Sequence, residues 1–392
     1  MSRKPLFSIL IPTKNRPGLV CDAIASVLLQ DGPKDDVEVI VSNNGGNQET
    51  KRAVASLPAD NRLKYVEPPG ELSMPDHWEW ASQLLTGDYV SILSDRLLLR
   101  QGALNSLRQL ISSHSHPQAI SWPVASYSEL SGTAAGLSDA DTPIQEWSSH
   151  SIWEGLKQGK YFFSPILARG LNSCVRSDIY ARIRGIRGRA FNLLTPDFSS
   201  AFSVLLVSDV ILHHRRPLVI AQGERFSNGS LMMRGVDTGY MKGLASNGQA
   251  VDVPLRDTAR PLVAPLMYDD YLTTAAAFGL PIRWEEMNPA NFYRDCFREV
   301  AMRHAAAVPW SSELIALRRD YRQAMTREGK ERHAEIRRAL RGTFPWRAFR
   351  GAAVDAWLGP KLAAPLRRVL HRRKGWEAHL TALDAAGFGR RK

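Results

Sequence analysis

The chain has 392 residues, of which 44% are hydrophobic and 23% are charged, as in a folded globular protein and unlike a disordered one. This length suggests two domains. No run of about 18 apolar residues predicts a membrane-spanning helix, and the first apolar run, 6–11, is too short for a signal peptide. The three cysteines are widely spaced, which argues against a disulfide framework or a zinc site and suits a reducing compartment: Cys21, Cys174 and Cys296.

The formal net charge of +12 is concentrated at one end of the chain. Residues 327–392 carry 17 Lys and Arg against 6 Asp and Glu, whereas residues 1–326 carry 34 against 33. The body of the protein is therefore almost neutral and the tail is basic.

The first 125 residues alternate between short apolar runs and segments with helical periodicity. Helices are predicted over 15–30, with Asn15 as N-cap and Pro17 in the first turn, and over 73–87. Strands alternating with helices indicate βαβ units and a mostly parallel sheet. The strands are predicted at 6–11, 37–42, 62–67, 89–93 and 119–124.

After about residue 128 this alternation stops. The Gly- and Ser-rich stretch 126–143 is typical of a long surface loop or lid. Helices are predicted at 172–183 and at 195–208, and an extended segment with a turn near Pro217 at 210–223. From about residue 310 the pattern is helical and basic.

Ligands of parallel α/β sheets bind beyond the carboxyl ends of the strands, so the residues that follow each strand matter most. Here these residues are PTKNR, NNGGNQ and SDR. Neither a GxGxxG nor a GxxxxGK[ST] sequence is present, which weakens a dinucleotide-binding or P-loop interpretation. A nucleotide would have to be held in another way.

The motifs SILIPTKNRPGLVCDAIASVLLQ, VEVIVSNNGG, GDYVSILSD and TPDF resemble those of the family 2 glycosyltransferases, inverting enzymes with the GT-A fold. The resemblance covers about the first 125 residues well and continues thinly to about 230. It implies an α/β, GT-A-like (Rossmann-like) mostly parallel sheet flanked by helices, with a helical C-terminal region. The expected organisation is a catalytic domain at 1–230, a helical or irregular extension at 231–326 that could serve the acceptor side, and a basic helical tail at 327–392.

The resemblance also implies a nucleotide-sugar donor across the ends of the first, second and fourth strands. Pro12, Thr13 and Asn15 match the loop that meets the base and ribose. Asn43 and Asn44 stand where the family often has acidic residues, and an amide can both donate to and accept from a uracil edge. Taken by itself, NNGG is better interpreted as a tight turn rich in residues that tolerate positive φ.

In the family, the fourth strand ends in an Asp-rich motif that holds Mg²⁺ or Mn²⁺ against the donor diphosphate. This chain keeps Asp95 but has Arg96 and Leu97 where further acids are expected. Asp95 is the predicted metal ligand, and Arg96 is an alternative partner for the diphosphate. A local surface ion pair between the two is the competing interpretation.

Inverting transfer needs a general base, which the family supplies from a helix start well after the metal motif. Asp197 in TPDF is the best match, with Asp178 a distant second. Helix capping is the competing role for Asp197.

Several other side chains carry weaker predictions. His213 and His214 could supply a further metal ligand but more often serve packing. Trp78 or Trp80 could stack on a sugar, yet their helical spacing favours the core. A third, weaker group follows the last strand and could shape the site: Glu224, Arg225 and Asn228.

The basic tail interleaves aromatic and aliphatic side chains with Arg and Lys. This pattern suits an interfacial helix on an anionic membrane surface, and equally a helical appendix packed on the catalytic domain. Nucleic acid is an unlikely partner, because no recognised binding module surrounds the cluster.

The sequence thus predicts a cytoplasmic, peripherally membrane-associated enzyme. It would move a sugar from a nucleoside-diphosphate donor to a hydroxyl acceptor, perhaps a lipid-linked glycan, in surface polysaccharide or glycolipid assembly. The rival hypothesis is a non-catalytic GT-A-like nucleotide-binding or assembly module with a degraded metal motif. The discriminating feature is whether Asp95 and Asp197 converge on one cleft; if they lie far apart, the enzyme hypothesis is weakened.

Overall fold

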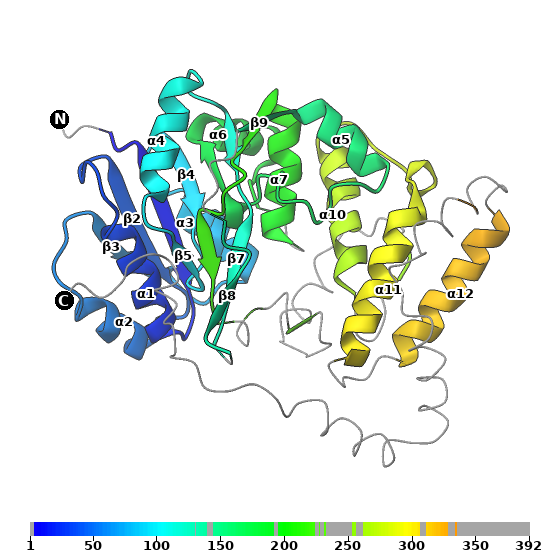
Figure 1. Cartoon of the computed structure of the whole chain (residues 1–392), viewed down its shortest axis with the longest axis horizontal. Helices are drawn as coiled ribbons and strands as arrows, with labels where there is room; N and C mark the ends of the chain where they lie inside the picture. Colours follow the sequence, from blue (N-terminus) through cyan, green and yellow to red (C-terminus); the bar gives the residue numbers. More distant parts are fainter. Residues whose placement is uncertain are drawn as a thin grey trace, which may run out of the picture.

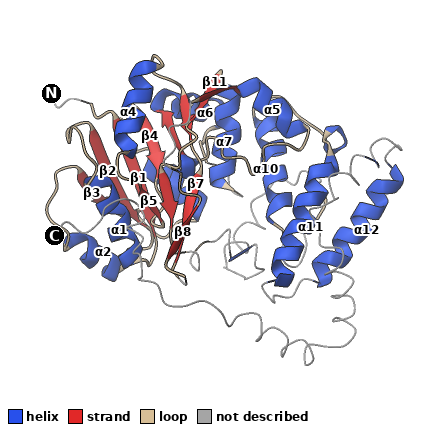
Figure 2. Cartoon of the chain, viewed as in Figure 1, coloured by secondary structure: helices blue, strands red, loops and turns tan. Residues whose placement is uncertain are grey.

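The computed structural model describes residues 4–129, 131–138, 144–191, 195–223, 227, 231–232, 253–255, 262–305, 311–327 and 334. Among these residues the strands form two sheets (Figure 2). The eight-stranded sheet has the order β3 (Leu63–Val66), β2 (Val37–Asn43), β1 (Phe7–Thr13), β4 (Tyr89–Ile92), β10 (Ser173–Arg176), β6 (Ala119–Ser121), β11 (Val210–His213) and β9 (Gln145–Ser148). The four-stranded sheet has the order β5 (Leu97–Leu99), β12 (Val219–Ala221), β7 (Val124–Ser128) and β8 (Thr133–Ala135).

Strand β1 is the centre of a parallel half of the larger sheet. It pairs in parallel with β2, from Phe7↔Val37 to Thr13↔Asn43, and with β4, from Phe7↔Tyr89 to Leu10↔Ile92. Strand β10 then pairs antiparallel with both β4 and β6, which makes the other half mixed. The prediction of a mostly parallel sheet is confirmed.

Alternate strand residues divide the interior into two cores, because successive side chains of a strand point to opposite faces. Phe7, Ile9 and Ile11 share one buried cluster with the apolar sides of α1 (Pro17–Leu28), α2 (Gln48–Ala55) and α4 (Ala103–Ser113). Leu10 belongs to the other cluster, with α3 (Met74–Ser82), α6 (Ser177–Arg187) and α7 (Pro196–Val207). The sheet is thus covered on both faces, as parallel sheets require.

The second core extends beyond the sheet into a group of helices (Figure 1). Helix α10 (Val263–Ala277) packs on α7 and on α11 (Pro289–Ala305), which in turn contacts α12 (Ser311–Arg327). Helix α5 (Ser149–Lys157) also packs on α7. The Tyr268 ring of α10 stacks on Phe162 with centroids 3.8 Å apart, so these helices share one core with the sheet.

Three local predictions need correction. The predicted helix at 172–183 begins as strand β10, because Cys174 and Val175 are buried in opposite cores between β4 and β6; α6 starts only at Ser177. Part of the predicted loop at 126–143 forms the β7–β8 hairpin. The N-cap of α1 is Arg16, without a side-chain cap bond, while Asn15 precedes it with φ of 57°.

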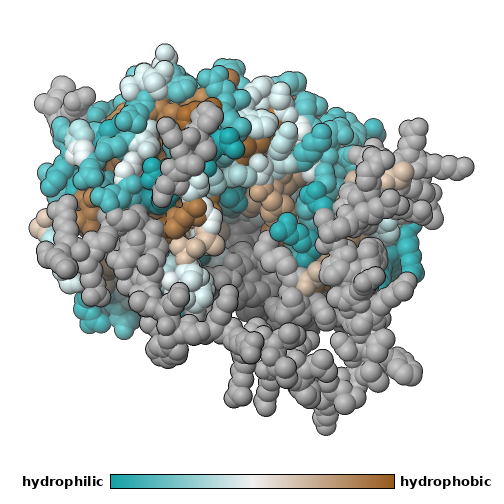
Figure 3. All heavy atoms as spheres, viewed as in Figure 1, coloured by the Kyte–Doolittle hydropathy of each residue, from teal (hydrophilic) through white to brown (hydrophobic). Residues whose placement is uncertain are grey.

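The C-terminal predictions are only partly covered by the described residues. The proposed boundary at 230 and the basic tail after Arg327 lie outside them, so the three-part domain division stays a prediction. No described helix is both long and apolar enough to cross a membrane. On the face in Figure 3 the described surface is mostly hydrophilic, with small hydrophobic areas.

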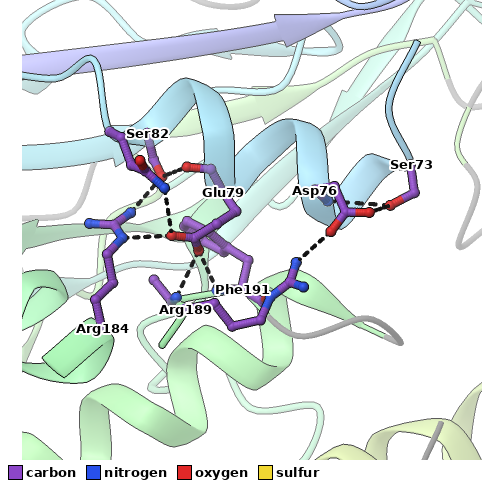
Figure 4. A network of polar contacts seen from close by, with 9 residues as sticks. Ser73, Asp76, Glu79, Ser82, Arg184, Arg189 and Phe191 are labelled. Atoms are coloured by element: carbon purple, nitrogen blue, oxygen red, sulfur yellow. Dashed lines mark hydrogen bonds and ion pairs between the residues drawn. The ribbon is translucent and has the colours of Figure 1, made fainter. Parts of the chain in front are cut away.

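A buried ion-pair network fixes α3 against α6 (Figure 4). The Glu79 carboxylate accepts hydrogen bonds from Arg184 Nε at 2.7 Å and from the backbone N–H groups of Ala190 and Phe191 at 2.7 and 3.2 Å. Burial alone would raise the pKa of Glu79, but Arg184 and these N–H groups outweigh it and lower the pKa. The carboxylate is therefore held ionised between two segments distant in sequence.

A second pair lies along the same helix. Arg189 Nη2 contacts Asp76 Oδ1 at 2.9 Å, and the Ser73 hydroxyl, which caps α3, donates to the other Asp76 oxygen at 2.6 Å. Trp78 meets the Phe191 ring edge-on, with centroids 5.8 Å apart. Together these contacts hold residues 189–191, which run toward the start of α7.

We expect Glu79→Ala to lower the free energy of unfolding by about 2 kcal/mol, because it leaves the partly buried Arg184 Nε and two backbone N–H groups without this acceptor. Urea unfolding monitored by circular dichroism measures this. The matched control is Glu154→Ala on α5, whose side chain is exposed and should cost less than about 1 kcal/mol. Equal losses for the two variants would contradict the structural role of Glu79.

Candidate functional site

The carboxyl ends of β1, β2 and β4 meet at one edge of the sheet. Asn44 N donates to the Thr13 carbonyl at 2.9 Å, which joins the ends of β2 and β1. Thr13 Oγ1 donates to Asp95 Oδ2 at 2.8 Å, which joins β1 to the residues after β4. Parallel pairing brings about this meeting, because all three strands point the same way.

Asp95 is the most enclosed charged group at this edge, with 2% of its surface exposed. Arg16 Nη1 contacts its second oxygen, Oδ1, at 3.0 Å. Burial raises the pKa of Asp95, while Arg16, Thr13 and the more distant charge of Arg96 act in the opposite direction. Both carboxylate oxygens are thus already occupied by protein donors.

The two asparagines after β2 have structural partners. The Asn44 side chain accepts from Leu72 N at 2.9 Å and donates to Leu72 O at 2.7 Å, and so ties the 67–73 loop to this edge. The Asn43 amide donates to Tyr65 OH at 2.8 Å and to Asn47 O at 3.1 Å. The Asn43 Oδ1 atom is buried and accepts no hydrogen bond from the described residues.

The loop after β1 is half buried and half open. Pro12 is buried in β1, and Asn15 is exposed in the left-handed conformation. Lys14 Nζ contacts Glu71 Oε1 at 2.6 Å, and this ion pair joins the loop to the 67–73 loop. The loop therefore presents polar groups to solvent next to the buried Asp95.

Arg96 points away from Asp95 and toward the smaller sheet. Its Nη1 donates to the Gln222 carbonyl at 3.1 Å, and its own carbonyl accepts from Gln222 N at 2.8 Å. The guanidinium therefore fastens the turn after β4 to the end of β12. The competing interpretation, a local surface ion pair with Arg96, does not describe Asp95, which is buried and contacts Arg16 instead.

Asp197 lies in the first turn of α7 and is partly buried. Asp270 of α10 accepts from Thr195 N at 2.5 Å and also from the Thr195 hydroxyl, and so fixes the residue that caps this helix. Burial raises the pKa of Asp197, while the nearby charge of Arg169 lowers it. The Arg169 guanidinium lies 4.9 Å from the Phe198 ring centroid.

Asp197 and Asp95 lie toward the same edge of the sheet. Gly170 packs so closely over β4 that a Cβ there would come within 3.4 Å of Ile92 Cδ1, which is three residues before Asp95. The neighbouring Arg169 reaches Phe198 and the charge of Asp197. The short helix η1 (Gly170–Asn172) contacts both β4 and α7.

Asp178 lies toward the opposite edge. It opens α6 just after Arg176, which pairs with Tyr89 at the start of β4. Arg176 donates to the Asp178 carboxylate from Nε at 2.6 Å and from Nη2 at 2.8 Å, and these contacts lower the pKa of Asp178. Of the two candidate bases, Asp197 is therefore the one toward the same sheet edge as Asp95.

The weaker predictions resolve mainly as structural roles. His213 is buried against Ser121 Oγ at 3.0 Å, and burial lowers its pKa to about 4. His214 Nδ1 accepts from Arg216 N at 3.1 Å. Trp78 and Trp80 pack in or against the core, while the third predicted group lies outside the described residues: Glu224, Arg225 and Asn228.

The described residues do not form a metal cage. They contain no group of three or more His, Cys, Asp or Glu side chains that could hold an ion. Asp95 is a single carboxylate, each oxygen of which already accepts one hydrogen bond, so Mg²⁺ or Mn²⁺ bound there would take its other ligands from phosphate and water.

Two residues of this edge were not singled out from the sequence. Arg16 was visible only as one member of PTKNR, and its contact with Asp95 spans 79 residues. His77 of α3 is 3% exposed, and its Nε2 lies 2.6 Å from Ser42 Oγ of β2. Burial and the charge of Lys14 lower the pKa of His77 to about 4.

The N-terminal part of the chain is similar in sequence to one family of enzymes. Residues 8–143, about a third of the chain, match the model of glycosyl transferase family 2. A GalNAc(5)-diNAcBac-PP-undecaprenol beta-1,3-glucosyltransferase of Campylobacter jejuni is 34% identical over 107 residues, which cover 27% of this chain and 34% of that protein. A validoxylamine A glucosyltransferase of Streptomyces hygroscopicus is 37% identical over 65 residues, 17% of this chain and 14% of that protein. The match thus spans about a third or less of either relative's length.

Solved structures give fainter matches. S. aureus TarS 1–349 in complex with UDP-GlcNAc has a TM-score of 0.47 and 13% identity, covering 81% of this chain and 92% of that chain. The mannosyltransferase PcManGT from Pyrobaculum calidifontis, in complex with GDP-Man and Mn²⁺, has a TM-score of 0.43 and 14% identity, covering 86% of each chain.

We expect His77 to make stability fall in mild acid. Its folded-state pKa of about 4 lies below the unfolded value, so its contribution is complete above about pH 6.5 and is lost as pH falls toward 4. Between pH 7 and 5 the group accounts for about 2 kcal/mol. His77→Gln should reduce the pH dependence of urea unfolding by that amount.

The matched control is His150→Gln, because His150 is exposed at the start of α5. An unchanged pH dependence in His77→Gln, or the same reduction in His150→Gln, would contradict this assignment.

Proposed function

Because residues 8–143 belong to glycosyl transferase family 2, we propose that the chain transfers a sugar from a nucleoside-diphosphate donor to a hydroxyl acceptor with inversion. The observation that carries the proposal is the meeting of three strand ends around Asp95, toward the same sheet edge as Asp197. The transferred group would be a hexosyl or related residue.

In this proposal the loop after β1 receives the nucleoside. Pro12, Thr13 and Asn15 line the base and ribose, and the unpaired Asn43 oxygen is available as an acceptor for a base N–H. Arg16, whose guanidinium is held by Asp95 at this edge, is the proposed cationic partner of the diphosphate. Asn44 and Arg96 act through the loops that they fasten.

Asp197 is the proposed general base. An inverting displacement needs one group to take the proton of the attacking hydroxyl as the bond to the anomeric carbon forms and the diphosphate leaves. Burial raises the pKa of Asp197 above that of an ordinary aspartate, which makes the carboxylate a stronger base. Asp270 holds the helix start through Thr195 and so fixes the direction of this carboxylate.

For the acceptor we propose a lipid-linked glycan in surface polysaccharide or glycolipid assembly. Support comes from the Campylobacter jejuni relative, a glucosyltransferase named for its undecaprenol-linked saccharide acceptor. A cytoplasmic, peripheral location, with the basic tail on anionic lipid, would suit such an acceptor. The alternative of a non-catalytic module is not favoured, because both curated relatives described above are named as glucosyltransferases.

We expect UDP to bind in EDTA, because Asp95 is a single carboxylate and the described residues offer no group of three metal-binding side chains. Calorimetry with a nucleoside diphosphate panel that begins with UDP, once with Mn²⁺ and once with EDTA, measures this. Binding only with Mn²⁺ would mean that Asp95 serves a cation site. No binding to any member would overturn the donor site.

We expect Asp197→Asn to lower the rate of sugar transfer about 10²-fold or more, because the amide cannot take the proton of the acceptor hydroxyl. The UDP affinity should not change. Product formation from a panel of nucleotide sugars measures the rate, and calorimetry measures the affinity. Asp178→Asn is the matched control, since Asp178 lies toward the opposite sheet edge, and it should retain activity. Full turnover by Asp197→Asn would refute the base assignment.

A further inference from the structure

A cavity of about 160 Å³ lies between the 159–164 loop and helix α11. Drug-sized ligands need several times this volume, so the cavity suits one small ring or less. Its lining combines aromatic rings with charged side chains: Gly159, Tyr161, Phe162, Phe163, Ser164, Arg294, Asp295 and Arg298.

The interior of this cavity contains buried polar atoms that the described residues leave unpaired. Asp295 is 6% exposed; its Oδ1 accepts from Arg294 Nε at 2.9 Å, but its Oδ2 has no hydrogen-bond partner. Behind the lining, the Tyr268 hydroxyl is also buried and has no hydrogen-bond partner among the described residues; it lies within 3.2 Å of where a Cβ on Gly159 would stand. Unpaired buried groups of this kind cost free energy unless a ligand or water satisfies them.

The rim of the cavity carries an aromatic face and a cation. The Phe163 ring is 44% exposed, which is unusual for a large apolar side chain beside a charged cleft. Arg298 is exposed on α11, and its positive charge acts to lower the pKa of the nearby Asp295. Tyr161 has φ of 67°, and its ring packs against Gly155, so the loop is held in an uncommon conformation.

The cavity adjoins the proposed base. Phe163 meets Phe198 edge-on, with centroids 6.5 Å apart, and Phe198 directly follows Asp197. One aromatic contact therefore separates the cavity from the residue that would deprotonate an acceptor hydroxyl.

We propose that this cavity is an acceptor subsite for one neutral sugar ring, an inference that rests on the proposed transfer function. A neutral sugar fits the lining because its hydroxyls can donate to Asp295 Oδ2 and accept from the arginines. Its apolar face stacks on Phe163.

Binding can be measured without turnover, by saturation-transfer NMR of the full chain. The probes are the methyl β-glycosides of glucose, galactose, N-acetylglucosamine and N-acetylgalactosamine. At least one should bind, and Phe163→Ala and Arg298→Ala should each weaken it about fivefold, the loss of one stacking or hydrogen-bond contact. Ile186→Ala, which removes an exposed side chain on α6, is the matched control. No binding by any probe, or equal binding by the variants, would overturn the subsite.

Kinetics separate this inference from the function on which it rests. If the wild-type chain transfers sugar, Phe163→Ala should raise the acceptor KM about fivefold relative to the wild type and leave the UDP affinity unchanged. An unchanged acceptor KM would overturn the subsite and leave the function standing. A chain that binds a glycoside but consumes no nucleotide sugar would support the subsite and overturn the function.

Discussion

The parallel pairing of β1 with both β2 and β4 is the constraint on which the candidate site depends. It brings three strand ends to one edge of the sheet and so places Thr13 beside Asp95. Burying the Asp95 carboxylate is costly, and Thr13 and Arg16 offset that cost by occupying both oxygens. The same contacts hold the loop after β1 in place, so the site is organised before any ligand arrives.

Helix α3 connects this edge to the proposed base. On one side His77 contacts Ser42 of β2, and on the other Glu79 accepts from Arg184 and from the backbone that leads toward α7. One helix therefore contacts both the end of β2 and residues 190–191. Damage to the Glu79 network would act on stability and on geometry together.

The helices that follow the family match supply the remaining parts. Asp270 of α10 fixes Thr195 at the start of α7, and Asp295 of α11 brings a buried, unpaired oxygen to the cavity beside Phe198. These residues lie far beyond residue 143, where the match ends. The strand ends around Asp95, which lie within the family match, are thus combined with helices that lie beyond it.

The sequence by itself determined the elements whose signals are local. Period-two and period-3.6 apolar patterns and the proline near each helix start were enough to predict β1, α1, β2, β4 and α7, and with them the polar strand ends. Asp95 and Asp197 were chosen because the motifs resemble those of the family. The predicted α/β class, a sheet flanked by helices, is confirmed.

Only the tertiary structure decided what depends on contacts between distant residues. Ser173–Arg176 is a strand because β4 and β6 lie on either side of it, and Arg96 turns to Gln222, 126 residues away. Asp270 and Asp295 carry no local signal that distinguishes them from solvated acids. Their roles arise from burial, and burial is decided by the packing of whole helices, which a local pattern does not encode.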